Sequence, residues 1–370
     1  MKKLWLLFFM ILAASGARAQ DFPDKEVYQA VFENVQQHYL DKSYNLSDLS
    51  LEIIRALSEV DKDFKTADDG KRITLYYKAR VLRSYLKPEN GTDVKAQIKM
   101  LGKVLTTAQK ASKKAAARDF ELVDDVLEIG VRKALDGDSA YYPESGENSA
   151  QKLRAGVTFA DRMIDNILYV RLRAFHDDTA AKLENSLQRH PEAAALILDL
   201  RGNPGGRLSE AVKIADLFLD EGIVISTSDR NGKNKYYTST DGDVLKGRPM
   251  VLLVDAETAS SAEALAVSLQ EQSRAKVIGT STYGKGSVQE LFPLSNGAEL
   301  GLTTAYFYAP SGAEMHGKGI VPDVCTFEMP ESKNVDNLLR LPKDTACGAE
   351  KRGLKNLDID AAAALLRQKI

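Results

Sequence analysis

Apolar residues in the second half of the chain follow two alternating patterns. Short runs rich in Val, Ile and Leu predict buried strands at Ile167–Phe175, Ala193–Leu200, Met250–Val254 and Ala275–Ile278. Between them, apolar residues recur at helical spacing and predict helices at Thr179–Arg189, at Leu208–Asp220 and after Ser260, where Ala262, Leu265, Ala266 and Leu269 share one face. Strands that alternate with helices are typical of a parallel sheet in an α/β fold.

Two further patterns predict antiparallel strands. Ile223–Ser228 and Lys235–Ser239 flank Asn231-Gly232, which is a strong hairpin signal. Glu299–Tyr308 alternates as another strand, and a Pro-Ser-Gly turn follows it.

The pattern from Lys25 to Leu135 is helical, and it contains no strand-like alternation. Val27, Val31 and Val35 lie on one apolar stripe, and similar stripes follow near Ile54 and Val126. We therefore expect an α-helical N-terminal domain. Its later part carries a basic run, which is either a solvated helix face or a docking surface for an acidic partner: Lys95, Lys99, Lys103, Lys110, Lys113, Lys114 and Arg118.

The first 19 residues have the three parts of a secretory signal peptide. Lys2 and Lys3 precede the apolar run Leu4–Ala14, and Ala17-Arg18-Ala19 forms a cleavage site. We expect cleavage after Ala19 and a periplasmic or secreted protein; a retained N-terminal anchor is the alternative. Later apolar runs are too short to span a bilayer.

The composition narrows the choice of partners and cofactors. The chain has 370 residues and a formal net charge of −2, which gives no indication of nucleic-acid binding. Its two cysteines, Cys325 and Cys347, are expected to form a disulfide in an oxidising compartment. The four histidines lack metal-ligand spacing, so no metal and no cofactor are predicted, and a Ser-His-Asp site is the weaker enzyme interpretation.

The stretch Val251–Gln289 holds the candidate chemistry. Ser260 or Ser261 begins the predicted helix after Met250–Val254, and a glycine-rich loop then presents Lys285. Ser and Thr at this position are also ordinary helix caps. The loop nearly matches a phosphate-binding loop, but Gly286 stands where that motif requires a magnesium-binding hydroxyl. The glycines that follow Arg201 could likewise cradle a phosphate.

These motifs together resemble the carboxyl-terminal processing peptidases, also called tail-specific proteases. The resemblance rests on TASSAEALA, TYGKGSVQ, LTTAYFYAPSG, GKGIVPD and LILDLRGNPGG, in a segment from about Val157 to Val324. It implies a crotonase- or ClpP-like β-α-β protease core at residues 167–325. By the family's motifs, the nucleophile is Ser260, the general base is Lys285, and Gln289 orients the lysine. The oxyanion donors would be Ser261 and either Gly205 or Gly206.

The chemistry of these residue types agrees with the roles that the resemblance implies. A serine hydroxyl needs a base within hydrogen-bond reach. An ordinary lysine side chain has a pKa of about 10.4, so a lysine base requires desolvation to be neutral at pH 7. A glutamine can accept a lysine N–H without adding a negative charge, whereas an aspartate would work against the mechanism.

The chain departs from the family's usual layout in two places. The family carries a PDZ domain after a short Asp-rich turn, which Asp136–Tyr142 resembles here, but the connection at residues 146–166 is too short for one and offers only a short strand near Gly156–Phe159. Residues 61–117 are an apparent helical insertion in the N-terminal domain, residues 20–145. A C-terminal tail at 326–370 is expected to hold the disulfide and a terminal helix.

Two functions from different classes remain open. The first is a serine endopeptidase that cleaves unfolded or C-terminally exposed proteins through an acyl-enzyme, with substrates delivered by an envelope adaptor bound to the helical domain. The second is a catalytically weak binding or scaffold protein on the same fold. Ser260, Lys285 and Gln289 favour the first, and the missing PDZ domain favours the second. The sequence allows a homo-oligomer.

Overall fold

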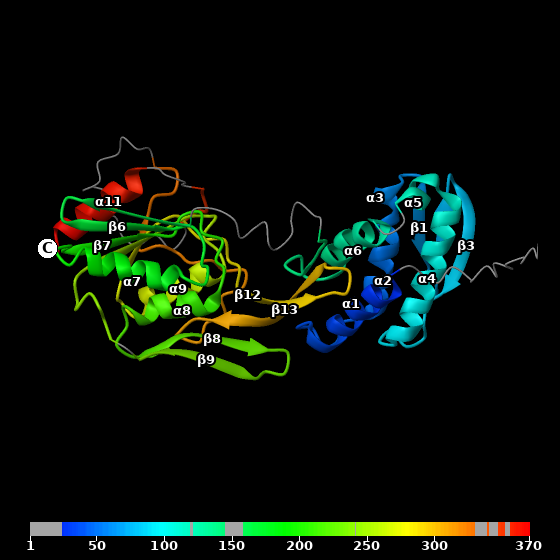
Figure 1. The fold of residues 1–370 in the computed structure, drawn as a ribbon, viewed down its shortest axis with the longest axis horizontal. Coiled ribbons are helices and arrows are strands. Elements are labelled where there is room, and N and C mark those ends of the chain that lie inside the picture. Colours follow the sequence, from blue (N-terminus) through cyan, green and yellow to red (C-terminus); the bar gives the residue numbers. More distant parts are fainter. Residues whose placement is uncertain are drawn as a thin grey trace, which may run out of the picture. The chain divides into compact units, whose positions relative to one another are not determined.

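The computed structural model describes residues 24–118, 121–144, 158–240, 242–329, 339, 347–351 and 356–370. The predicted signal peptide and most of the 146–166 connection lie outside them. The chain divides into two compact units (Figure 1). The first contains the described residues up to Glu33 with Asn45–Ala134 and Leu294–Asn296, and the second contains Asn34–Tyr44 and the rest. The turn at Asp136–Tyr142 thus belongs to the second unit.

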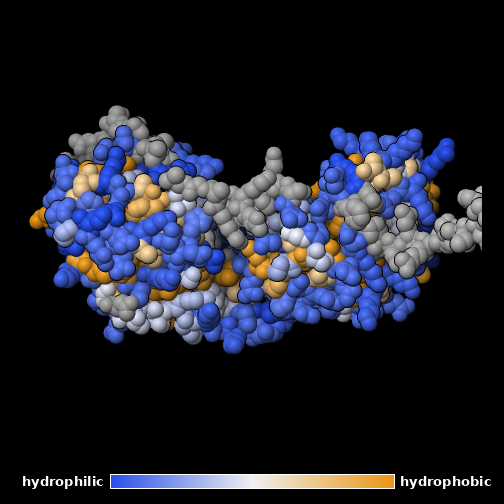
Figure 2. Space-filling view, viewed as in Figure 1, coloured by the Kyte–Doolittle hydropathy of each residue, from blue (hydrophilic) through white to orange (hydrophobic). Residues whose placement is uncertain are grey.

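Helices build most of the first unit, as the apolar stripes predicted. They are α1 (Lys25–His38, whose last turn belongs to the second unit), α2 (Leu46–Arg55), α3 (Leu57–Val60), α4 (Val94–Ala111), α5 (Lys113–Ala117) and α6 (Glu121–Ala134). Side chains of Asn45 and Asp93 cap α2 and α4 by accepting backbone N–H bonds. A Cβ on Gly130 would lie 2.8 Å from the Ile53 Cα, so glycine permits α6 to pack closely on α2. In the view of Figure 2, most of this unit's surface is hydrophilic.

The prediction that residues 61–117 are helical throughout is wrong for residues 64–86. They form an antiparallel sheet of β1 (Phe64–Asp68), β2 (Arg72–Tyr77) and β3 (Arg80–Leu86). In β2 only Ile73 and Leu75 alternate into the core, and β1 and β3 each bury one residue, Phe64 and Tyr85. These patterns are too short to stand out in the sequence. The second turn places Lys78 and Ala79 at φ 50° and 62° without using a glycine, so it lacks the usual hairpin signal.

The main sheet of the second unit has six strands in the order β14-β11-β10-β7-β6-β5. They are β5 (Phe159–Ile164), β6 (Ile167–Leu172), β7 (Ala195–Asp199), β10 (Met250–Val254), β11 (Lys276–Gly279) and β14 (Val324–Cys325). All neighbouring pairs are parallel except β5 with β6. The predicted α/β class is therefore confirmed, whereas the strand expected near Gly156 begins at Phe159 and continues to Ile164.

Both faces of this sheet are covered. On one side lie α7 (Thr179–Arg189), α8 (Leu208–Asp216) and α9 (Ser261–Glu271), and α11 (Asn356–Arg367) lies on the other (Figure 1). Alternate residues of β6 accordingly enter two different cores: Leu168 packs on the side of α7–α9 and Ile167 on the side of α11. The buried Arg201 guanidinium pairs with Asp199 at 2.7 Å and with Asp358 of α11 at 3.0 Å. It thereby ties the end of β7 to α11.

The second sheet is antiparallel, and β13 lies at its centre. Its order is β12-β13-β8-β9, and β4 also pairs with β13. The strands are β4 (Ala140–Tyr142), β8 (Gly222–Asp229), β9 (Asn234–Ser239), β12 (Ser287–Pro293) and β13 (Glu299–Tyr308). The predicted hairpin between β8 and β9 is confirmed. Because β4 follows the Asp136 turn and β12 follows the Lys285 loop, this sheet brings distant parts of the sequence together.

The expected disulfide joins Cys325, in β14, to Cys347. The link holds residues 347–351 of the C-terminal tail against the edge of the main sheet, because β14 pairs with β11. Among the described residues, no helix is both long and apolar enough to cross a membrane.

Candidate active site

Ser260 lies in a sharp turn between β10 and α9. Its backbone has φ 58° and ψ −125°, a conformation that costs energy for any residue except glycine. Strained strand-to-helix turns of this kind expose a nucleophile at the carboxyl edge of a sheet. Ser260 is partly exposed, whereas Ser261 is buried and its hydroxyl donates to the Gly206 carbonyl at 3.1 Å. Of the two hydroxyls, that of Ser260 is therefore the accessible one.

The Ser260 turn is bonded to the turn that follows β7. The Thr258 hydroxyl donates to the Leu200 carbonyl at 2.9 Å, and the Ala259 N–H donates to the Asn203 carbonyl at 2.9 Å. In the other direction, the Gly202 N–H donates to the Asp255 carboxylate at 2.9 Å. These bonds hold the glycine-rich turn beside the candidate nucleophile.

The two glycines proposed as oxyanion donors differ in their hydrogen bonds. The Gly205 N–H donates to the Asn203 side chain at 2.8 Å, so it is already used. Among the described residues, the N–H groups of Gly206 and Ser261 have no hydrogen-bond partner. A Cβ on Gly205 would lie 2.9 Å from the Ala259 carbonyl oxygen, so glycine allows this close contact. The geometry therefore favours Gly206 over Gly205 as the donor that acts with Ser261.

Glu263 connects the Ser260 turn to the Lys285 loop. Its carboxylate accepts the Ser260 N–H at 2.9 Å, the Lys285 N–H at 2.8 Å and the Gly284 N–H at 2.7 Å. It also accepts the Thr282 hydroxyl at 2.5 Å. Burial raises the pKa of the Glu263 carboxyl above its ordinary value, although these bonds oppose the shift. One buried carboxylate thus fixes the backbone of both catalytic candidates.

Glu263→Gln should lower both stability and activity. A glutamine has one acceptor oxygen and turns an NH₂ group toward N–H donors, so about two of the four bonds are lost. We expect a loss of about 2–4 kcal/mol in the free energy of unfolding, measured by urea denaturation. If the variant is folded at the assay temperature, its kcat/KM should also fall, because the two backbones lose their shared anchor.

Glu257→Gln is the matched control for this change. Glu257 lies on the same turn and is exposed, and its carboxylate pairs with Lys351 on the surface. It should alter the unfolding free energy by less than about 1 kcal/mol. Equal effects of the two substitutions would contradict the role given to Glu263.

The Lys285 side chain lies next to a carboxylate. Its Nζ is 3.7 Å from Oδ1 of Asp138, and the two side chains are 27% and 21% exposed. No hydrogen bond joins the Lys285 ammonium to the Ser260 hydroxyl in the part of the chain that the structure describes. The structure thus brings the Ser260 and Lys285 backbones together through Glu263, but the lysine head group pairs with Asp138.

Gln289 reaches Lys285 only through intermediaries in this arrangement. Its amide nitrogen donates to the Ser287 hydroxyl at 2.9 Å and to the Thr303 hydroxyl at 3.3 Å. Ser287 in turn donates to the other oxygen of Asp138. A chain of polar contacts therefore runs from Gln289 through Ser287, both in β12, to Asp138 and on to Lys285.

Sequence reasoning missed two residues of this site. Glu263 stands three positions after Ser260, which is the spacing of a helix capping box, and this signal could have identified it. Asp138 lies in a tight turn in which the Asp136 carboxylate accepts the N–H groups of Asp138 and Ser139. Because Asp138 is far from Lys285 in sequence, only the pairing of β4 and β12 with β13 brings them together.

Comparison with known proteins identifies the second unit's core. The model of peptidase family S41 matches residues 166–326. A carboxy-terminal-processing protease of Bartonella bacilliformis is 37% identical over 170 residues, which are 44% of this chain and 39% of that protein. A carboxyl-terminal-processing protease of Synechocystis sp. is 40% identical over 157 residues, 42% of this chain and 36% of that protein. The chain thus spans about two fifths of the length of these relatives.

A solved structure supports the fold. A lipoprotein from Streptococcus agalactiae aligns with a TM-score of 0.55 and 19% identity, covering 81% of this chain and 91% of that one. At this identity the likeness concerns the fold alone. Together with the family match and the strand-turn-helix arrangement at Ser260, the comparisons give one conclusion: residues 166–326 of this chain belong to peptidase family S41.

Proposed function

We propose that this chain is a serine endopeptidase that cleaves unfolded or C-terminally exposed protein segments. The observation that carries the proposal is the accessible Ser260 hydroxyl on its strained turn, beside two unbonded N–H groups and tied through Glu263 to the Lys285 loop. The proposed substrate class follows from the likeness to carboxyl-terminal-processing proteases.

The proposed reaction proceeds through an acyl-enzyme. The Ser260 Oγ attacks the scissile carbonyl carbon, and neutral Lys285 takes the hydroxyl proton. The N–H groups of Ser261 and Gly206 bind the resulting oxyanion. When the C–N bond breaks, the lysine ammonium gives its proton to the leaving amine. Water then attacks the ester with the lysine again as base, and this step releases the new carboxylate and restores Ser260.

The Asp138 carboxylate adds a condition to this mechanism. The Lys285 Nζ lies 3.7 Å from the Asp138 carboxylate, whereas the proposed mechanism requires it within hydrogen-bond reach of the Ser260 hydroxyl. In the proposed active arrangement, Lys285 leaves Asp138 and turns toward the Ser260 hydroxyl. Gln289, whose side chain is already close through Ser287, then accepts a lysine N–H and fixes its direction.

We also propose that the protein acts outside the cytoplasm. The pattern of residues 2–19 supports export, and the Cys325–Cys347 disulfide fits an oxidising compartment.

The second candidate function is a catalytically weak scaffold protein. The observation that favours it is the pairing of Lys285 with Asp138.

Incubation of the purified chain with β-casein tests the proposal and separates the two candidates. We expect fragments that accumulate with time, and a serine-reactive lactone should add its mass at Ser260 and stop the cleavage. Heat-denatured protein treated in the same way is the control for non-specific labelling. A folded protein that neither cleaves nor takes the label would support the scaffold and remove the protease proposal.

A further inference from the structure

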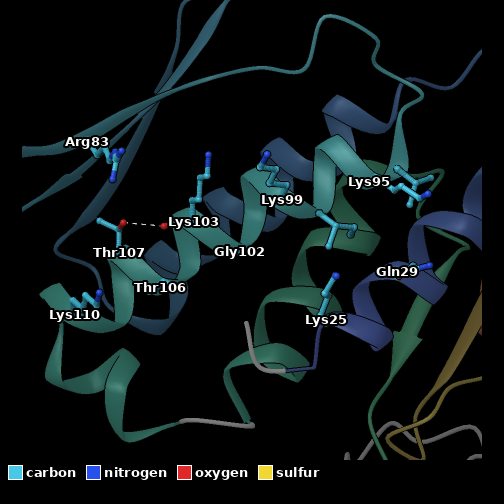
Figure 3. Close-up of a pocket in the computed structure, with 12 residues that line it drawn as sticks. Lys25, Gln29, Arg83, Lys95, Lys99, Gly102, Lys103, Thr106, Thr107 and Lys110 are labelled. Carbon is cyan, nitrogen blue, oxygen red and sulfur yellow. Dashed lines mark hydrogen bonds between the residues drawn. The ribbon is translucent and has the colours of Figure 1, made fainter. Parts of the chain in front are cut away.

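A basic groove lies on the first unit, and none of its lining residues belongs to the candidate active site. It has a volume of about 630 Å³ and lies along the exposed side of α4, with Lys25 of α1 and Arg83 of β3 at its borders (Figure 3). Val94, Ile98 and Gly102 give it an apolar floor, and Thr106 and Thr107 supply hydroxyls. The groove thus combines a surface for side-chain packing with polar groups.

Every charged residue in its lining is a cation. They are Lys25, Arg83, Lys95, Lys99, Lys103 and Lys110, and all six are exposed. None of them forms an ion pair with any residue that the structure describes. The chain as a whole has a net charge of only −2, so this concentration of positive charge is local. The positive charge of the groove therefore does not reflect an overall basic composition.

The lysines form a row with a regular spacing. Lys95, Lys99 and Lys103 are four residues apart on α4, and Lys99 and Lys103 project in the same direction (Figure 3). Four helical residues rise by about 6 Å. Like charges at this spacing repel one another, whereas alternating signs along a helix face are typical of a solvent-exposed helix. The opposite face of α4, which includes Leu101, Val104 and Leu105, is buried and already accounts for the packing of the helix.

We propose that this groove binds an acidic segment of a partner protein, with successive carboxylates about 6 Å apart, as on one face of a helix with Glu at every fourth position. The charge of the lining requires an anionic partner. A concave site with an apolar floor fits side chains better than a flat membrane surface. The lining contains no aromatic ring on which a nucleobase could stack. Among anionic macromolecules, these features favour an acidic protein segment.

Fluorescence anisotropy with the full chain tests the proposal. The probe is a labelled 13-residue alanine-rich peptide with Glu at every fourth position, and the matched peptide has Gln at those positions. We expect saturable binding of the Glu peptide only, and about tenfold weaker binding in 0.5 M than in 0.05 M salt. The triple variant Lys95→Glu, Lys99→Glu, Lys103→Glu should lose at least about tenfold in affinity. Circular dichroism would verify that it remains folded.

The matched control reverses the same amount of charge elsewhere on this unit. Lys62, Lys65 and Lys71 are exposed and do not line the groove, so their triple replacement by Glu should leave the affinity within about twofold. Equal losses in the two triple variants would overturn the groove as the site, as would equal binding of the Gln peptide. Binding to anionic phosphatidylglycerol vesicles without binding to the Glu peptide would also overturn it. Because the readout is binding, it does not depend on peptidase activity.

Discussion

Ser260→Ala should abolish cleavage of an unfolded protein while the fold stays intact. The substitution removes the one accessible hydroxyl of the turn between β10 and α9, and kcat/KM on a peptide substrate should fall by at least about 10³-fold. The conformational energy of a backbone at φ 58° is similar for alanine and serine, so the midpoint temperature of thermal unfolding should change little. Initial rates on a fluorogenic peptide, with a melting curve for each variant, measure both effects.

Ser261→Ala is the matched control. It keeps the backbone N–H proposed to bind the oxyanion and loses only the hydroxyl bond to the Gly206 carbonyl, so a decrease of about tenfold in kcat/KM is expected. The reverse ranking, with an inactive Ser261→Ala and an active Ser260→Ala, would assign the nucleophile to Ser261. The buried position of Ser261 argues against that outcome.

Lys285→Arg should be as inactive as Lys285→Ala. A guanidinium stays protonated at any working pH, so arginine cannot take the Ser260 proton although it keeps the positive charge. Arginine also keeps the pairing with Asp138, which makes a folding defect unexpected. We expect kcat/KM to fall by at least about 10³-fold in both variants, measured from pH 6 to pH 10. Appreciable turnover by Lys285→Arg would rule out the general-base role.

Asp138→Asn separates the two possible effects of the carboxylate on Lys285. If Asp138 holds the lysine in a resting position, removal of the charge should leave kcat/KM equal to or greater than that of the unaltered protein at pH 7. Asparagine can still accept the hydrogen bond from Ser287, so the local turn is preserved. A loss of activity as large as that of Lys285→Ala would instead mean that the pairing itself is needed for catalysis.

The elements around the site were predictable because their signals are local. β10, α7 and β13 have the bounds that the apolar pattern gave, since a buried strand or an amphipathic helix can be recognised within about ten residues. The sheet β1–β3 was missed although Asp69-Gly70, in the turn between β1 and β2, is a hairpin signal. Its strands bury few residues, and the second turn at Lys78-Ala79 lacks a glycine. Local patterns therefore predicted the protease core better than the first unit.

The sequence by itself determined the alternation of strands and helices in the second unit, the Ser260 turn and the order of the motifs, because each depends on neighbouring residues. Only the tertiary structure decided which groups meet. Glu263 joins two loops through its four accepted bonds, and Asp138 reaches Lys285 because β4 and β12 pair with the same strand. It also decided that Gly205 uses its N–H internally while Gly206 does not. Hydrogen bonds and ion pairs between distant residues depend on the packing of the whole sheet, and no local pattern encodes them.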